Sequence, residues 1–303
     1  MIAYFEELLE SWDKNNRIKH TSINAYRRSL NILKVSHNGI LPSGELNRES
    51  IATVVRYMRS RKDEDSYIKK TLDHIKTFIY HAVRDESLPI IKANPVQTKD
   101  FGLREYSSDK IYLTHEEVNR IASLDLTKEA RKEVVRDIFL MAVYTGQRYS
   151  DVISSNNWQI GLSEFGGYFL KYRSKKTGHV SQLPLKKEAM DILKKYPNGI
   201  PMRSNVELNR ILKHIGKTAG IDQLVTRTEH RDGETITNQV PKYTQITMHT
   251  ARRTFCTLAV RAGVPTQVIM KLSGHETESS FRLYIRHSLD DVMQDAMKHQ
   301  FFK

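Results

Sequence analysis

The chain has almost no cysteine: Cys256 is the only one among its 303 residues, so no disulfide can form within it. Long apolar runs are also lacking, and none approaches the roughly 20 residues that a membrane-spanning helix needs. The segment from Met1 to Glu7 has neither the basic start nor the apolar core of a signal peptide. We therefore expect a soluble globular protein of a reducing cytoplasm, without a membrane partner.

Residues that mark common cofactor and metal sites are missing as well. No Gly-x-x-x-x-Gly-Lys-Ser/Thr loop is present, so the sequence does not imply ATP binding. The histidines lack the His-Glu-x-x-His spacing, and one cysteine cannot supply a cysteine-rich zinc site. The sequence thus predicts neither a cofactor nor a bound metal.

Acidic residues are absent from two stretches, one between Glu164 and Glu188 and the other between Glu234 and Glu276. In the whole chain, 48 Lys and Arg residues outnumber 35 Asp and Glu residues, which gives a net charge of +13. A solvated basic surface would also produce this charge. Such a surface would not explain why the acid-free stretches hold Lys176 and Arg252, which are candidate catalytic residues. A phosphate-binding surface explains both the positive charge and the position of these stretches.

Helical periodicity dominates the first part of the chain. Apolar residues recur at helical spacing in four segments, at residues 4–12, 22–35, 49–60 and from Ser66 to Val83. Pro89, Pro95 and Gly102 then interrupt the pattern and indicate a linker over residues 89–112. Four successive helices predict a compact helical bundle, and we place the domain boundary near residue 105.

The remainder of the chain mixes helices with short strands. Alternating apolar and polar residues predict strands at 158–160, 168–172 and 180–185, with turns at Gly166-Gly167 and Thr177-Gly178. Helices are predicted over 130–144, from Ser204 to Ala219, from Thr247 to Gly263 and from Pro265 to Leu272. Residues 223–246 are polar and fit either a loop or a hairpin. The predicted fold class is therefore mainly α with a small antiparallel β-sheet, an α+β arrangement.

Two arginines are candidates for binding the oxygens of a phosphodiester. Arg148 follows a predicted helix end at Thr145-Gly146. Arg252 lies three residues after His249, so His249 and Arg252 share one helical face. A planar, permanently charged guanidinium makes bidentate contacts with phosphate, and two of them can grip both non-bridging oxygens. Asp151 could support the site by orienting a guanidinium, or it could cap the next helical turn.

Lysines near a predicted hairpin tip are candidates for proton transfer and for DNA contacts. Lys176 abuts the turn at Thr177-Gly178, where its ammonium could protonate a leaving oxygen. Lys175 competes for that role, and both lysines could instead only contact the DNA backbone. The candidates for DNA contacts are Lys171, Arg173, Lys175, Lys242 and Arg253.

Tyr284 is the candidate nucleophile among 14 tyrosines, because it follows the pair Gly274-His275 and is flanked by Arg282 and Arg286. A free phenol has a pKa of about 10 and is a poor nucleophile at neutral pH. Neighbouring cations and a histidine can stabilise the phenolate as it attacks. His275 is expected to donate a hydrogen bond to a phosphate oxygen.

These residues, in the order Arg148, Lys176, His249, Arg252, His275 and Tyr284, resemble the catalytic set of the tyrosine recombinase (phage integrase) family. The segments Met248 to Phe255 and Leu272 to His275 are especially similar to that family. The segment from Ser204 to Ile221 is similar to integrases of Bacteroides-type mobile elements.

The resemblance implies two domains. Residues 1–105 would form a helical, SAM-like core-binding domain that binds DNA, and residues 106–303 the catalytic domain, with a C-terminal docking helix at about 289–301. Many integrases carry a further N-terminal domain that binds arm-type DNA sites. The first predicted helix begins at Ile2 and leaves no room for it, which fits either a naturally short recombinase or a shortened chain.

The resemblance also implies a reaction and its partners. Tyr284 would form a 3′-phosphotyrosine intermediate, and Lys176 would protonate the 5′-oxygen that leaves. Double-stranded DNA at specific recombination sites is the expected partner, bound by a homotetramer on two sites that is a monomer in free solution. Accessory DNA-bending or excision proteins and a location at the bacterial nucleoid are also expected.

Integration or excision of a mobile element is the leading functional hypothesis. Chromosome-dimer resolution and DNA inversion share the same active site and stay open. DNA relaxation by an enzyme similar to type IB topoisomerases uses the same chemistry without a partner duplex. A non-catalytic DNA-binding regulator is the alternative from a different class, and it would not need all six residues.

Overall fold

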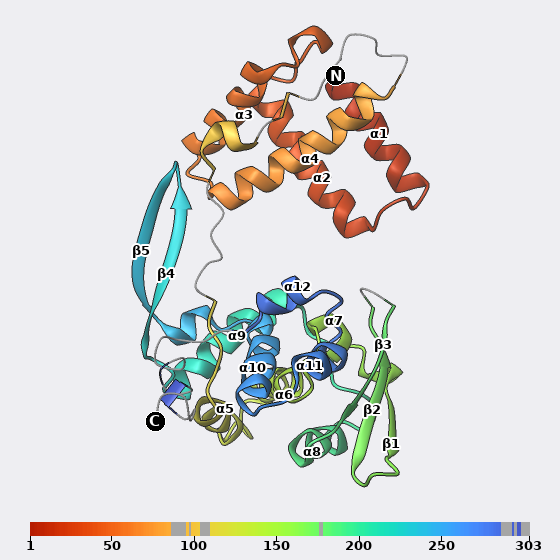
Figure 1. Cartoon of the computed structure of the whole chain (residues 1–303), viewed down its shortest axis with the longest axis vertical. Helices are drawn as coiled ribbons and strands as arrows, with labels where there is room; N and C mark the ends of the chain where they lie inside the picture. Colours follow the sequence, from red (N-terminus) through yellow and green to blue (C-terminus); the bar gives the residue numbers. More distant parts are fainter. Residues whose placement is uncertain are drawn as a thin grey trace. The chain divides into compact units, whose positions relative to one another are not determined.

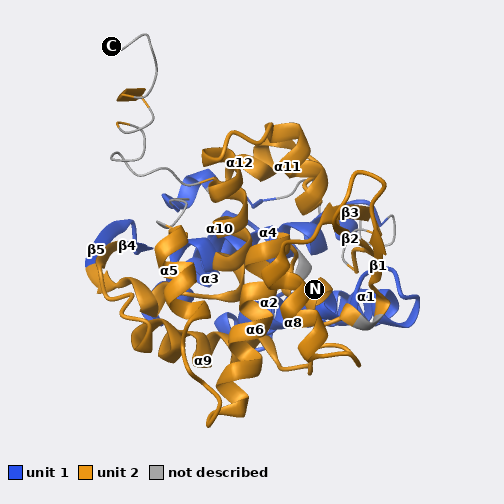
Figure 2. Ribbon diagram, turned by 90° about the horizontal axis from the view of Figure 1, so that it is seen from below, with its two compact units in different colours: residues 1–108, 227–238 blue, residues 109–226, 239–303 orange. Residues whose placement is uncertain are grey.

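The computed structural model describes residues 1–85, 95–96, 98–103, 110–175, 178–285, 293 and 296–297. The chain forms two compact units, which Figure 2 colours separately. Unit 1 comprises residues 1–108 together with 227–238, and unit 2 comprises residues 109–226 and 239–303. The sequence predicted a single division near residue 105, whereas residues 227–238, which come after that boundary in the sequence, belong to unit 1.

Unit 1 is built from four helices, as the apolar periodicity predicts (Figure 1): α1 (Ile2–Lys14), α2 (His20–Ser36), α3 (Arg48–Ser60) and α4 (Asp65–Val83). Asn47 opens α3 through a capping box with Ser50. The apolar faces meet around Phe78, whose ring stacks on those of Phe5 and Trp12 at centroid distances of 5.3 and 5.7 Å. These aromatic side chains give the small bundle a core of its own.

The helices of unit 2 surround one central helix. They are α5 (His115–Ala122), α6 (Ala130–Thr145), α7 (Tyr149–Val152), α8 (Lys187–Lys195), α9 (Asn205–Thr218), α10 (Met248–Arg261), α11 (Thr266–Ser273) and α12 (Glu278–Arg282). From Ile138 to Val143 every residue of α6 is buried, and α6 packs against α8, α9 and α10. A helix that is apolar on all sides lies in a core, so α6 is the element that positions the others.

A three-stranded antiparallel sheet borders these helices, in the order β1 (Gln159–Leu162), β2 (Tyr168–Arg173) and β3 (Val180–Pro184). Leu170 of β2 pairs with Leu183 of β3, and both are buried. Because side chains alternate along a strand, Lys171 and Arg173 point to the opposite, exposed face. β3 packs beside α11, which brings the sheet next to the end of that helix.

The polar segment at 223–246 forms a hairpin rather than a loop, with strands β4 (Leu224–Arg231) and β5 (Glu234–Pro241). Its turn is Asp232-Gly233, and both residues have a positive φ, of +54° and +75°. A tight hairpin turn of this kind favours Asp-Gly because both central residues adopt left-handed conformations. Most of β5 is exposed and most of β4 is only half-buried, so neither strand needs the alternating apolar residues of a buried face.

A small core joins α10, α11 and α12. Cys256 of α10, Ile269 of α11 and Phe281 of α12 are fully buried against one another. Burial raises the pKa of the Cys256 thiol to about 11. Tyr284 packs at the edge of this cluster, so the core fixes the segment that carries the candidate nucleophile.

Most of the predicted docking helix at 289–301 lies outside the described residues. Met293, Ala296 and Met297 are described and helical, and the side chains of Met293 and Met297 are 61% and 68% exposed. Within the described part of the chain, no helix combines the length and the apolar character needed to cross a bilayer.

Candidate active site

Arg148 lies where α6 gives way to α7 and the backbone turns sharply. Gly146 ends α6 in the left-handed conformation, with a φ of +67°, and Arg148 then precedes α7 in an extended conformation. The Nη2 atom of Arg148 donates to the carbonyl oxygen of Gly274 at 3.0 Å. Its Nη1 atom is buried and has no hydrogen-bond partner among the described residues, which leaves a donor available to a ligand.

Arg252 projects from α10 into the interior and is 1% exposed. Its Nη1 atom donates to the carbonyl oxygen of Gly146 at 2.8 Å and to that of Ser273. Its Nη2 atom lies 3.0 Å from Nε2 of His275. Burial and then the nearby charge of Arg148 lower the pKa of Arg252, but an arginine begins so far above neutrality that it stays charged.

The two guanidinium groups therefore form a positive site without a counter-ion. Among the described residues, the hydrogen bonds of Arg148 and Arg252 go to backbone carbonyls and to His275, and none goes to a carboxylate. Buried charge that is not neutralised is costly in free energy. An anion that binds both groups, such as a phosphodiester, removes that cost, so the arginine pair fits the predicted substrate chemistry.

Tyr284 and His249 lie in direct contact. The hydroxyl oxygen of Tyr284 is 2.7 Å from Nε2 of His249. Desolvation of the ring is the largest cause that lowers the pKa of His249, to about 4, and repulsion from Arg253 and Arg252 follows. His249 is more than a third exposed, and the lowered pKa favours its neutral imidazole, in which Nε2 can accept a hydrogen bond from the Tyr284 hydroxyl.

His275 completes the group around the tyrosine. Its Nδ1 atom lies 2.7 Å from Oγ of Ser273, and its ring lies 4.6 Å from the Tyr284 ring, centroid to centroid. Burial first, and then the charges of Arg252 and Arg148, lower the pKa of His275 to about 3. Five of the six predicted catalytic residues thus meet in unit 2: Arg148, His249, Arg252, His275 and Tyr284.

The sixth residue, Lys176, lies outside the described residues, and its role as the acid stays a prediction. The structure does show what holds the chain next to it. Asp151 is 2% exposed, and its carboxylate accepts hydrogen bonds from the backbone N–H of Lys175 at 2.9 Å and from the hydroxyl of Ser174 at 3.3 Å. Both bonds go to the turn after β2 rather than to a guanidinium, so Asp151 anchors the lysine-bearing turn to α7.

The predicted DNA contacts separate into two groups. Lys171 and Arg173 are exposed on one face of β2, and Lys175 is exposed beyond it. Lys242 is 7% exposed instead, and its ammonium lies 2.7 Å from a carboxylate oxygen of buried Glu117. Lys242 is therefore not placed to contact DNA, contrary to the prediction. Arg253, another predicted DNA contact, is also buried, at 8% exposure.

The backbone carbonyls at the end of α11 are part of the site, and the sequence did not predict this. The carbonyl oxygens of Ser273 and Gly274 receive hydrogen bonds from Arg252 and Arg148, and Gly274 itself is left-handed, with a φ of +67°. Backbone acceptors carry no sequence signal of their own. The Gly-His pair drew attention to His275, but nothing in the sequence indicated that the residues before it hold both arginines.

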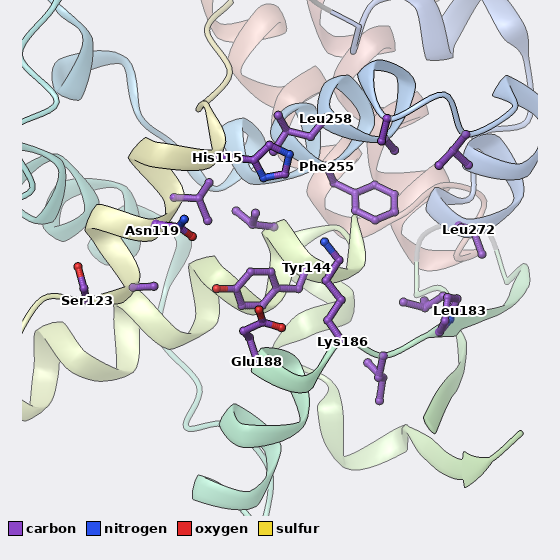
Figure 3. Close-up of a pocket in the computed structure, with 18 residues that line it drawn as sticks. His115, Asn119, Ser123, Tyr144, Leu183, Lys186, Glu188, Phe255, Leu258 and Leu272 are labelled. Carbon is purple, nitrogen blue, oxygen red and sulfur yellow. The ribbon is translucent and has the colours of Figure 1, made fainter. Parts of the chain in front are cut away.

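A separate apolar cavity of about 650 Å³ lies in unit 2. Figure 3 shows Phe255 and Leu258 of α10, Tyr144 of α6 and Leu272 of α11 turned toward it. Lys186 and Glu188, near the start of α8, supply charged groups among its lining residues. None of the five described candidate catalytic residues lines this cavity, so it is distinct from the arginine and tyrosine cluster.

We expect Gly146→Ala to destabilise unit 2 by about 2–4 kcal/mol. A Cβ atom at this position would lie 2.4 Å from the Phe255 ring, and the left-handed backbone adds strain. Gly263→Ala is the matched control, because Gly263 has a φ of +78° and no neighbouring atom within 4 Å of a Cβ. Urea unfolding should show a clearly smaller loss for the control. Equal losses would mean that Phe255 moves aside without cost.

The phage integrase family matches residues 111–290, which is more than half of the chain. A comparison with curated proteins gives no match. Among solved structures, the fold is similar to that of the Tn1549 transposon integrase in complex with transposon right-end DNA, with a TM-score of 0.66, 18% identity, and 98% of each chain covered. It is also similar to the XerH site-specific recombinase in a post-cleavage complex with a palindromic difH substrate, with a TM-score of 0.64 and 13% identity. That match covers 98% of this chain and 84% of the recombinase. The chain therefore belongs to the phage integrase family, the tyrosine-type site-specific DNA recombinases.

Proposed function

We propose that this protein cuts and rejoins DNA at specific sites through a covalent bond to Tyr284, and that it integrates or excises a mobile element. The observation that carries the proposal is the pair of inward-facing arginines. Arg148 and Arg252 meet beside Tyr284 without a carboxylate partner among the described residues, and each retains a buried guanidinium nitrogen with no hydrogen bond, Nη1 and Nε respectively. A scissile phosphate would supply the missing negative charge.

The proposed cleavage step combines the contact between Tyr284 and His249 with the predicted role of Lys176. The Tyr284 oxygen attacks phosphorus while its proton moves to Nε2 of His249, which lies 2.7 Å away. The bond between phosphorus and the 5′-oxygen breaks, and Lys176 gives that oxygen a proton. The product is a 3′-phosphotyrosine and a free 5′-hydroxyl. Attack by a 5′-hydroxyl from a partner duplex reverses each transfer and rejoins the strand.

The nucleophile acts within its own protomer in this proposal. Tyr284 belongs to the same chain as His249 and Arg252, and its ring lies 5.3 Å from the Arg252 guanidinium. The small core around Cys256 and Phe281 holds the tyrosine segment against α10. No rearrangement between protomers is then required before the first strand is cut.

Binding to double-stranded DNA is supported by two observations. Lys171, Arg173 and Lys175 form an exposed basic row on β2 and the turn that follows it. The similar Tn1549 integrase and XerH recombinase are both in complex with DNA. We propose that the helical domain 1–105 is a second DNA-binding domain. Accessory DNA-bending or excision proteins are proposed as further partners, and the nucleoid in the cytoplasm as the location.

Assembly into a tetramer on two DNA sites would use the C-terminal docking helix. Met293 and Met297 are four residues apart, so they lie on one helical face, and both are largely exposed. The apolar cavity lined by Phe255 and Leu258 (Figure 3) is a receptor of suitable chemistry in a neighbouring protomer. We propose that each tail occupies the cavity of the next copy when the protein is bound to DNA.

A nicked suicide substrate tests the proposed function directly. Protein mixed with this DNA should form an adduct that survives denaturation, and digestion should leave a 3′-phosphonucleotide on the peptide that contains Tyr284. The adduct should also form in EDTA, because arginine and lysine supply the positive charge. Transfer of the cut strand to a second duplex would favour recombination, while relaxation of a supercoiled plasmid alone would favour topoisomerase-like activity. Absence of any adduct would favour a DNA-binding regulator.

A further inference from the structure

The structure assigns Ser273 as a positioning residue that holds His275 in one tautomer, with the proton on Nδ1 and the lone pair of Nε2 directed at Arg252. This inference rests on the proposed function, because it explains how His275 is prepared for the phosphate. Ser273 is the last residue of α11, is fully buried, and lies two residues before His275.

The contact at Nε2 determines where the imidazole proton lies. Nη2 of Arg252 is 3.0 Å from Nε2 of His275. A guanidinium has donors and no acceptor, so Nε2 must present a lone pair to it. A neutral imidazole whose Nε2 accepts a hydrogen bond carries its proton on Nδ1.

The contact at Nδ1 leads to the same tautomer independently. Oγ of Ser273 lies 2.7 Å from Nδ1 of His275 and 2.6 Å from the carbonyl oxygen of Ile269. The carbonyl can only accept, so the serine hydroxyl donates to it and its oxygen is left to accept from Nδ1–H. A directed chain of hydrogen bonds therefore runs from Arg252 through His275 and Ser273 to Ile269.

The same hydrogen bonds also hold the His275 ring in place for the state with a bound phosphate. When a phosphate oxygen takes the N–H of Arg252, Nε2 can take up a proton from solvent and donate a hydrogen bond to the phosphate, while Nδ1–H stays hydrogen-bonded to Ser273. The ring does not have to turn over. In the free site, burial and the charges of Arg252, Arg148 and His249 disfavour protonation of His275, and a bound phosphate has the opposite effect.

Without the serine hydroxyl, the other tautomer becomes accessible. Its proton would lie on Nε2 and point at the Arg252 guanidinium, which also carries only donors. The ring would then turn or shift away from the arginine. Loss of a partner that orients a metal-ligating histidine lowers activity by about 10-fold to 100-fold, and we expect a loss of the same order here.

Nitrogen NMR of the uniformly ¹⁵N-labelled protein tests the tautomer without any DNA. We expect His275 near pH 7 to show a protonated Nδ1 and an unprotonated Nε2, with its signals identified by their loss in His275→Gln. Ser273→Ala should shift the population toward protonated Nε2, and Ser273→Thr should retain the native pattern. His74 is an internal standard, because its Nδ1 lies 2.8 Å from Oγ of Ser29, which also donates to a backbone carbonyl at 3.3 Å, and its signals should stay unchanged.

Cleavage kinetics on the suicide substrate provide the second readout. Ser273→Ala should lower the single-turnover rate by about 10-fold to 100-fold at saturating protein, and Ser273→Thr should restore most of it. Ser29→Ala removes the matching serine in α2 and should leave the rate unchanged. A native spectrum with protonated Nε2 would overturn the inference, even if Ser273→Ala failed to fold. An unchanged rate in Ser273→Ala would overturn the positioning role. A native protein with the expected tautomer but no cleavage would instead refute the proposed function.

Discussion

Tyr284→Phe is expected to abolish covalent attachment to DNA while leaving DNA affinity unchanged. The substitution removes only the hydroxyl that lies 2.7 Å from Nε2 of His249. The ring can keep its place beside His275 and Arg252, at 4.6 and 5.3 Å. Loss of the nucleophile leaves no group to form the intermediate, so the adduct should fall by at least about 1000-fold. A denaturing gel measures the adduct, and fluorescence anisotropy measures binding.

Tyr168→Phe is the matched control for this experiment. Tyr168 is 49% exposed at the start of β2, in the same unit as the candidate site. Its loss of a hydroxyl should leave adduct formation as it is in the native protein. Persistent adduct in Tyr284→Phe would show that another residue is the nucleophile.

Arg252→Lys is expected to lower the rate of cleavage by about 100-fold to 1000-fold, although it keeps the charge. The Arg252 guanidinium binds Gly146, Ser273 and His275 at once through two nitrogens. A lysine ammonium has one nitrogen and no planar fork, so it cannot hold these groups and also bind a phosphate oxygen. Single-turnover cleavage at saturating protein separates this loss from a change in DNA affinity.

Arg131→Lys provides the comparison within the same unit. Arg131 lies on α6 with a side chain that is 69% exposed, and it pairs with Glu207. Exposed ion pairs contribute little to stability, so its replacement should change neither rate nor fold. Native activity in Arg252→Lys would show that charge alone suffices, and that the bidentate geometry has no part in catalysis.

The helices that carry the site follow from local sequence signals. Gly146 and Gly274 mark the ends of α6 and α11, because both adopt left-handed conformations that glycine tolerates best. The spacing of His249 and Arg252 places both on α10, as predicted from helical periodicity. Turn glycines likewise predicted the three-stranded sheet. These features are readable from the sequence because each depends on residues close together in the chain.

Features that depend on distant residues were not predictable in the same way. Lys242 is a basic residue in an acid-free stretch, which is why it was predicted to contact DNA. In the structure it is buried and pairs with Glu117, which lies on a helix far away in the sequence. Asp151 was predicted to orient a guanidinium or to cap a helical turn, but its carboxylate bonds, among the described residues, to Ser174 and Lys175 on the turn after β2. The hydrogen bond between Ser273 and His275 required the three-dimensional path of α11 and the approach of Arg252.

The buried thiol of Cys256 has a practical consequence for labelling. It is fully enclosed, and its pKa of about 11 keeps it protonated at neutral pH. Maleimides and similar reagents should therefore leave the native chain unmodified. A cysteine introduced at Met297, which is 68% exposed, would then be the one reactive thiol, so a fluorophore or crosslinker could be attached to the tail without removing any native residue of the core.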